Sequence, residues 1–252
     1  GEIGGTTPLA SLTTEGGDTS LGGNVTTTGN QKFGSDVTLT GDTKFVSGNL
    51  FDLSGLVGGG YNVEIDAGSA AIDAETYGVS GVADLTVPGD VGLNGVITTT
   101  GNQLYSGEVG LLGDTTLVAG TGSISLGTGG EVIGVSHTLT LGDASQTGAV
   151  TLGGSVDIDG LEVGQGAFDL SITTSQGDSF NVSKFVDIPS NGTLNINTDE
   201  NSPLNFESGL NATNPSSINL AGAIASSGGP GLSFGYAKVG YGSQNATLTV
   251  GG

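Results

Sequence analysis

Residues 25–46 read VTTTGNQKFGSDVTLTGDTKFV, and residues 97–118 read ITTTGNQLYSGEVGLLGDTTLV. Aligned without a gap, so that Val25 meets Ile97, the two stretches are identical at 12 of 22 positions. A weaker match continues upstream of both. Because a fixed period is the sequence signature of a repeat architecture, two repeat units of about 72 residues are expected head to tail, over about residues 9–81 and 82–152.

Short runs of alternating apolar and polar residues, each closed by a turn-forming residue, extend this pattern over the chain. They lie at residues 37–40, 138–141, 156–159, 194–197 and 247–250. Alternation with a period of two places one side chain inward and the next outward, which is typical of half-buried strands. The Gly-Asp and Gly-Asn pairs that interrupt the runs have the chemistry of turns. No helical stripe accompanies them, so the sequence predicts an all-β fold.

The composition favours a β-solenoid over a sandwich. Glycine fills 50 of 252 positions, and aromatic residues make up 5% of the chain. Sandwich interiors usually carry aromatic residues, whereas small residues suit a narrow tube with tight corners. We therefore predict a parallel β-helix of roughly 20 residues a coil, about a dozen coils and a rod on the order of 60 Å long.

Several functional classes are excluded by composition. The chain has no Cys and one histidine, His137, which argues against disulfides, zinc ribbons, Fe–S clusters and thiol nucleophiles. Four Lys or Arg against 25 Asp or Glu give a net charge of −21, which opposes binding to nucleic acid and to anionic lipid. No apolar run reaches the length of a membrane helix, so no membrane insertion is expected. The chain starts at Gly1, which indicates a processed chain or an excised segment.

The repeated motifs form a recognisable set. They are GGTTPLASLTT (residues 4–14), VTTTGNQ-x-F (25–33), VTL (37–39), GDT (41–43), ITTTGNQ-x-Y (97–105) and GDTTL (113–117). This set resembles the repeats of filamentous-haemagglutinin-type surface exoproteins, which are large bacterial adhesins exported by two-partner secretion or autotransporter routes. The resemblance covers residues 1–118. It implies a right-handed parallel β-helix, a secreted or cell-surface location, an adhesive or scaffold role and no catalytic residues.

The Thr-Thr-Thr-Gly-Asn-Gln blocks have two interpretations. One is a ladder of threonines that faces a ligand, such as a glycan or ice. The other is structural: threonine fills outward strand positions, Gly-Asn makes the turn, and stacked asparagines form ladders. We favour the structural interpretation, because the paired threonines do not recur at an even spacing.

Acidic residues offer the candidate metal ligands. Five aspartates that follow a glycine are expected to form turns: Asp18, Asp42, Asp90, Asp114 and Asp143. Asp157 and Asp159 are two residues apart on one expected outward face, with Glu162 nearby, and calcium binds where several carboxylate oxygens converge. These three residues are the predicted calcium site; no other cofactor is expected.

The remaining candidate sites are two acidic residues, one histidine and five asparagines. Asp157 and Asp159 also support the alternative function, a carbohydrate-binding or carbohydrate-active β-helix module. His137 lies in a strand-like run and is expected to be structural or to face solvent. Five Asn-x-Ser/Thr sequons are candidate glycosylation sites: Asn24, Asn181, Asn191, Asn211 and Asn245.

The last part of the chain differs in charge from the rest. Residues 208–252 contain no acid and a single charged residue, Lys238. We therefore divide the chain into an acidic β-solenoid over residues 1–207 and an uncharged segment over residues 208–252 that is a candidate assembly contact. The expected function is a non-enzymatic, extracellular structural or adhesive rod that associates with itself, end to end in a fibre, or with a glycan or protein of a host or cell surface.

Overall fold

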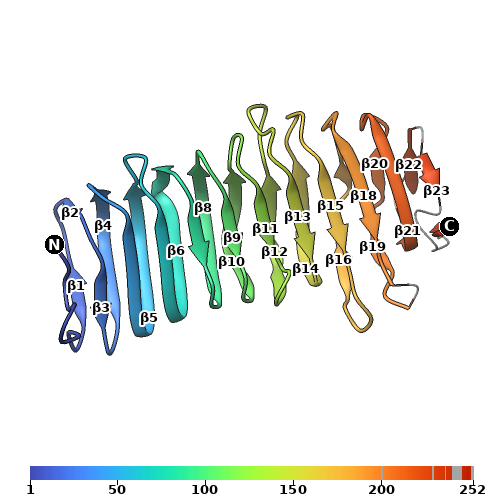
Figure 1. Ribbon diagram of the computed structural model, residues 1–252. Helices are drawn as coiled ribbons and strands as arrows, with labels where there is room; N and C mark the ends of the chain where they lie inside the picture. Colours follow the sequence, from blue (N-terminus) through green and yellow to red (C-terminus); the bar gives the residue numbers. More distant parts are fainter. Residues whose placement is uncertain (200, 229, 236, 240–245, 251–252) are drawn as a thin grey trace.

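The computed structural model describes residues 1–199, 201–228, 230–235, 237–239 and 246–250, the last two ranges by their backbone alone. The chain forms an elongated stack of about eleven coils, with its two ends at opposite ends of the stack (Figure 1). Neighbouring coils pair in parallel. The prediction of an all-β parallel β-helix is confirmed. Among the described residues, no helix has the length and apolar character needed to cross a membrane.

The strands are short where a coil turns sharply and long where one strand bends around a corner. In chain order they are β1 (Leu12–Thr14), β2 (Thr19–Leu21), β3 (Val25–Thr27), β4 (Gln31–Leu39), β5 (Thr43–Val57), β6 (Val63–Val82), β7 (Leu85–Val87), β8 (Val91–Thr99), β9 (Gln103–Tyr105), β10 (Val109–Val118), β11 (Ile124–Leu126), β12 (Glu131–Leu141), β13 (Val150–Gly153), β14 (Ser155–Val163), β15 (Leu170–Thr173), β16 (Phe180–Val182), β17 (Val186–Asp187), β18 (Thr193–Asn197), β19 (Leu204–Phe206), β20 (Leu210–Ala212), β21 (Ser217–Ser226), β22 (Leu232–Phe234), β23 (Ala237–Val239) and β24 (Ala246–Val250).

Each coil has three sides. β5 covers all three and pairs with β6 at Thr43, Leu53 and Leu56, with shifts of register between these stretches. We call the side of the rod that contains Thr43 side A, that of Leu53 side B and that of Leu56 side C, and we name each corner by the two sides it joins.

Coil length varies along the rod. On side A, Leu85 of β7 pairs with Gln103 of β9, whereas Ile124 of β11 pairs with Val150 of β13. The second of these coils is therefore longer than the first, although both return to the same side in parallel register. The extra residues are accommodated at the corners, and the sides stay aligned.

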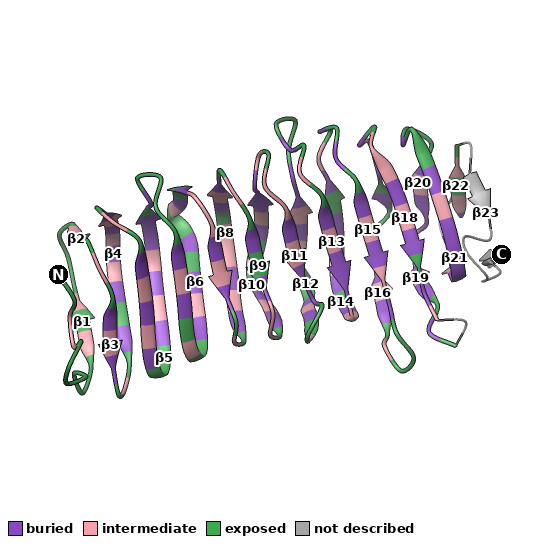
Figure 2. Ribbon diagram, in the orientation of Figure 1, coloured by how far each residue is buried: buried purple, intermediate pink, exposed green. Residues whose placement is uncertain are grey.

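The core consists of columns of inward side chains, and burial alternates along most strands (Figure 2). One column on side A stacks Val150, Leu170, Leu194 and Ile218, each at most 1% exposed. Burial of one such side chain contributes roughly 1.5–3 kcal/mol, and the column repeats that contribution at every coil. The aliphatic alternation seen in the sequence therefore supplies most of the core.

Aromatic side chains fill the interior of the first coils. Phe33, Phe45 and Phe51 contact one another, with ring centroids 5.0 to 5.9 Å apart. All three are fully buried. Offset and edge-to-face arrangements of this kind add about 0.5–1.5 kcal/mol per pair beyond the buried area.

Glycines allow close contact between coils at the C–A corner. Gly101, Gly122 and Gly148 precede the side A strands β9, β11 and β13. A Cβ atom on Gly148 would overlap the carbonyl group of Gly122, and a Cβ atom on Gly122 would overlap that of Gly101. Only a residue without a side chain fits there, because the backbone of the coil below occupies the space.

Replacement of Gly148 by alanine should therefore destabilise the stack by about 2 kcal/mol or more, since backbone must move to admit the methyl group. Gly110 is the matched control, because a Cβ atom on it meets no atom within 4 Å. Gly110→Ala should change stability by no more than about 0.5 kcal/mol. Urea unfolding of the two variants measures the difference, and equal midpoints would contradict this account of the corner.

Candidate functional site

The most distinctive side chains of the repeat are two buried glutamines. The Gln31 side chain donates from Nε2 to the carbonyls of Val25 (3.2 Å) and Val46 (2.8 Å). Gln103 makes the equivalent bonds to Ile97 (3.1 Å) and Val118 (2.8 Å). Each amide thus satisfies a carbonyl of its own coil and one of the next coil. Both glutamines are 0% exposed, so they close a corner from the inside and are not available to a ligand.

The second threonine of each block belongs to the same corner. Thr27 and Thr99 are buried, and each donates from Oγ1 to a carbonyl two residues later, at Gly29 and Gly101. The structural interpretation of the Thr-Thr-Thr-Gly-Asn-Gln block is therefore confirmed, with one correction. This threonine points inward, because its hydroxyl satisfies a carbonyl of the tight turn.

The two copies of the block lie on different sides of the rod. β3, which contains Thr27, pairs with β5 on side A. The equivalent Thr99 lies in β8, whose residue Ile97 pairs on side C with Val79 and Leu117. From β3 the chain makes three full turns to β7, which is nine steps from one side to the next. It then passes to side B and to side C, so the two blocks are eleven steps apart. The two threonine blocks therefore do not stack into one ladder.

A third buried glutamine was not found from the sequence. Gln146 donates from Nε2 to Gly122 (2.9 Å) and Gly148 (2.8 Å), and its Oε1 accepts the backbone N–H of Ala119 (2.8 Å). It lies in the sequence Ser-Gln-Thr-Gly, where glutamine beside a corner glycine is the only signal.

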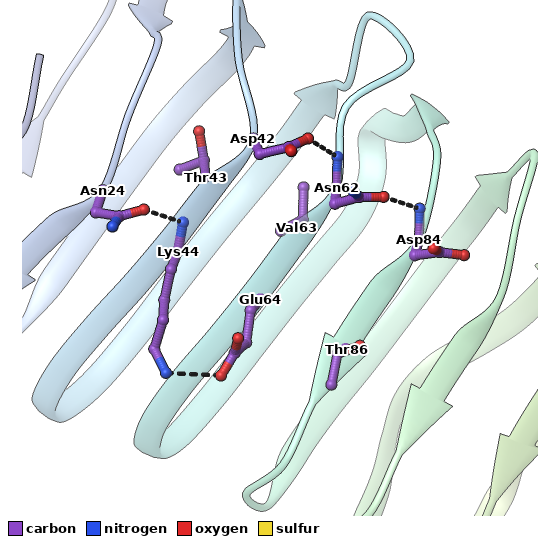
Figure 3. Close-up of a pocket in the computed structure, with 9 residues that line it drawn as sticks. All are labelled: Asn24, Asp42, Thr43, Lys44, Asn62, Val63, Glu64, Asp84 and Thr86. Carbon is purple, nitrogen blue, oxygen red and sulfur yellow. Dashed lines mark hydrogen bonds and ion pairs between the residues drawn. The ribbon is translucent and has the colours of Figure 1, made fainter.

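Outside the C–A corner, a row of Asx side chains links successive coils (Figure 3). Asp42 Oδ1 accepts the backbone N–H of Asn62 (2.8 Å), and Asn62 Oδ1 accepts that of Asp84 (3.2 Å). Asp84 and Asn102 continue the row to the next two coils. We call these four residues the Asx row. It satisfies N–H groups where the corner interrupts the strand hydrogen bonds.

The aspartates that follow a glycine act in two ways. Asp42, Asp90 and Asp114 each accept a backbone N–H of the next coil through Oδ1. Asp143 accepts the N–H of Ser145 in its own turn, so the prediction of a turn former is confirmed for Asp143. For the other three the correction is that they link coils, and Asp18 stays a prediction.

The surface beside the Asx row carries an ion-pair cluster. Lys44 Nζ lies 2.7 Å from Glu64 and 3.1 Å from Asp66 (Figure 3 shows the first pair). Hydrogen bonds to Glu64 and then to Asp66 raise the pKa of Lys44 above its usual 10.5. All three side chains are at least one-third exposed, and exposed ion pairs contribute little to stability. The lysine is thus held as a cation that pairs with two carboxylates of the coil above, and the cluster keeps one net negative charge.

The predicted calcium ligands have separate partners. Asp157 lies on side B, where its Oδ1 accepts a hydrogen bond from Asn181 (3.4 Å). Asp159 lies at the B–C corner and pairs with Lys184 at 2.7 Å. Glu162 lies on side C and accepts a hydrogen bond from Thr140 (3.4 Å). Within the described residues no three acidic or histidine side chains are placed to hold one metal ion. Calcium binding stays a prediction that needs Asp159 to leave its lysine.

The sequons lie in different environments. Asn24 accepts the backbone N–H of Lys44, and Asn191 is exposed. Asn181 and Asn211 are part of side-chain ladders, in which their Nδ2 groups donate to Asp157 and Asp187. Asn245 lies outside the described residues. Glycosylation stays a prediction.

The stack continues across residue 207 without a break. β20 pairs with β17, and β21 pairs with β18 and β19. The described part of residues 208–252 therefore belongs to the last coils of the rod. Its role as an assembly contact stays a prediction.

No family model matches this chain, and neither a curated protein nor a solved structure matches it. The structure shows a β-solenoid repeat protein. These comparisons give no support to the predicted similarity to filamentous-haemagglutinin-type repeats.

Replacement of Gln103 by alanine should cost about 2–4 kcal/mol of stability, because it leaves two buried carbonyls without a donor and creates a cavity. Gln31→Ala should cost a similar amount at its own corner. Gln165 is exposed, so Gln165→Ala is the control, with an expected change within about 0.5 kcal/mol. Urea denaturation measures all three, and a Gln103 variant as stable as the Gln165 variant would refute the proposed closure of the corner.

Tyr105 gives the chain a pH-dependent stability. Its hydroxyl donates to Gln103 Oε1 (3.1 Å), and complete burial raises its pKa above the usual 10.0. The native state therefore retains a proton that the unfolded chain releases above about pH 10, so stability falls as pH rises beyond that value.

Tyr105→Phe should reduce this alkaline slope. The substitution should lower the free energy of unfolding by about 1 kcal/mol near neutral pH, because Gln103 Oε1 loses its donor. The first copy already has this arrangement, since Phe33 takes the place of the tyrosine and Gln31 Oε1 has no hydrogen-bond partner. Tyrosine absorbance during alkaline titration, with urea unfolding at each pH, measures both effects. An unchanged slope in the variant would contradict the assignment.

Proposed function

We propose that this chain is a non-enzymatic, extracellular rod with a structural or adhesive role. The observation that carries the proposal is the continuous parallel pairing of the coils, from the bridge between Ile3 and Val25 to the pairing of β21 with β24. Hydrogen bonds between coils run along the axis, so the rod resists bending and stretching. A stiff rod suits a protein that displays a surface at a distance from its anchor.

The side-chain chemistry of the surface supports a passive role. The Asx row and the asparagine ladders use their polar atoms to hold neighbouring coils together. One ladder runs from Asp157 through Asn181 to Asn205, with a second bond of 2.9 Å. The three lysines whose side chains are described, Lys32, Lys44 and Lys184, are all paired with acids. These groups stabilise the stack, and the remaining negative charge keeps rods apart and soluble.

The resemblance to filamentous-haemagglutinin-type repeats supports the location and the adhesive role. End-to-end association follows the same physics, because a parallel stack of coils offers paired strands along its sides and free edge groups wherever it stops. A glycan or a protein of a cell surface is the proposed ligand class for the sides.

Small-angle scattering and electron microscopy test this function. A single chain should be a rod of about 11 × 4.8 Å, on the order of 50 Å. Raising the concentration should lengthen the particles in multiples of that value without widening them. A chain shortened to residues 1–207 should stay single if the C-terminal segment provides the contact. Compact particles would overturn the rod, and thicker particles would overturn end-to-end association.

A further inference from the structure

Five large apolar residues face solvent along one corner of the rod. They are Tyr77 (52% exposed), Val96 (50%), Leu112 (57%), Val135 (67%) and Phe185 (44%). We call them the apolar ridge. The first four lie in β6, β8, β10 and β12, where successive coils turn from side B to side C. The coil between Val135 and Phe185 has Asp159 at this corner, so five of six consecutive coils contribute.

The apolar ridge is not required by the solenoid. The C–A corner solves the same turning problem with the Asx row, whose polar atoms hold the next coil. These side chains pack in part on the coil below, Leu112 over Gly92 and Tyr77 over Gly55, and about half of each lies in water. Exposed apolar side chains gathered at one corner of successive coils favour an interaction site.

The ridge borders a depression with acidic edges. A cavity of about 490 Å³ is lined by Val96 and Leu112 together with Glu75, Asp114 and His137. Leu112 lies across Gly92, where a Cβ atom would be 2.7 Å from its Cδ1. Glu75 and Asp114 are exposed. The depression therefore presents two apolar side chains, Val96 and Leu112, beside two carboxylates.

The negative charge at the B–C corner indicates which kind of partner the ridge can bind. Further along the corner Lys184 is paired with Asp159 at 2.7 Å. The hydrogen bond and charge of Asp159, and then the charges of Asp114 and Glu162, raise the pKa of Lys184. The corner therefore keeps a negative balance. Contact with the acidic side of a second rod, or with an anionic membrane, would be opposed at this corner. A partner with apolar and basic groups is attracted.

Spacing selects the secondary structure of the partner. Adjacent coils are about 4.8 Å apart, so four ridge residues span about 14 Å. Same-face residues of an α-helix recur about every 5.4 Å and span about 16 Å over three intervals. Same-face residues of a strand recur about every 6.7 Å and span about 20 Å. A helix along the rod axis therefore matches the ridge far better than a strand.

We propose that the apolar ridge binds a lysine- or arginine-rich amphipathic α-helix of another protein, laid along the rod axis. Its leucine-type residues contact Val96, Leu112 and Val135, and its basic residues pair with Glu75 and Asp114. This function goes beyond the rod itself and does not depend on end-to-end association.

The test uses a fluorescent 18-residue peptide of leucine and lysine, with leucine at helical spacing, and the full-length chain. Fluorescence anisotropy should show saturable binding that a scrambled peptide of the same composition lacks. Leu112→Ser with Val135→Ser should weaken binding by about tenfold or more, as expected when central apolar contacts are lost. Val57→Ser with Leu104→Ser is the control, since both residues are exposed away from the ridge, and should change affinity less than about twofold.

A second pair of variants tests the charges. Glu75→Gln with Asp114→Asn should weaken binding several-fold and reduce its salt dependence. Asp42→Asn with Asp90→Asn removes the same charge elsewhere and should have a smaller effect. In Asp42, Asp90 and Asp114 alike, the amide oxygen of asparagine can still accept the backbone N–H.

Several outcomes would overturn the ridge as a docking site. Equal effects of the ridge and control variants, or equal binding of the scrambled peptide, would show general attraction to an acidic rod. Ridge-dependent binding to anionic phospholipid vesicles, without peptide binding, would identify a membrane surface instead. Circular dichroism checks that every variant folds. Because particle shape is measured separately, a failure here leaves the rod function standing.

Discussion

Each coil must return to the side where it began, paired in parallel with the coil beneath it. The rest of the structure depends on this constraint. The sides meet it with parallel backbone hydrogen bonds between strands about 4.8 Å apart. At a corner the backbone leaves that pattern and its polar groups need other partners. The chain supplies them from inside, with Gln31, Gln103 and Gln146, and from outside, with the Asx row. At the corners, side chains therefore supply the hydrogen bonds between coils that the backbone supplies on the sides.

Local alternation predicted the sides of the rod well. Residues 156–159 and 194–197 lie within β14 and β18, with the expected inward and outward side chains. A period of two is set by the backbone of a single strand, so it can be read without knowing its neighbours. The glutamines were missed for the opposite reason. A polar residue in a turn-like sequence suggests solvent, and only the carbonyl of the next coil, 15 residues away, explains its burial.

The candidate site illustrates the limit of local patterns. A spacing of two residues predicts that Asp157 and Asp159 share one outward face, which holds as long as the strand runs straight. The chain bends toward the B–C corner at Asp159, so Asp157 and Glu162 end on different sides of the rod, with Lys184 bound to the aspartate between them. The apolar ridge was equally hidden, because its first four members lie in four separate strands, one to a coil, at uneven intervals along the sequence. Only the register of the coils brings them together.

The two copies of the internal repeat share their buried corner hydrogen bonds but differ in the surface residues that they present. The repeat unit spans eleven strand segments, which is not a whole number of turns, so a duplicated unit reproduces corners but rotates them to other sides. The hydrogen bonds of Gln31 and Gln103 survive this rotation, since both corners offer the same pair of carbonyls, one from each of two successive coils. Surface features do not. Thr40 in the first copy aligns with Leu112 in the second. Thr40 lies at the C–A corner and bonds to the coil below, whereas Leu112 lies at the B–C corner beside Val96. The apolar residue occurs in the copy whose rotation places it on the ridge, which is expected if the ridge is selected for contact with a partner rather than inherited with the repeat.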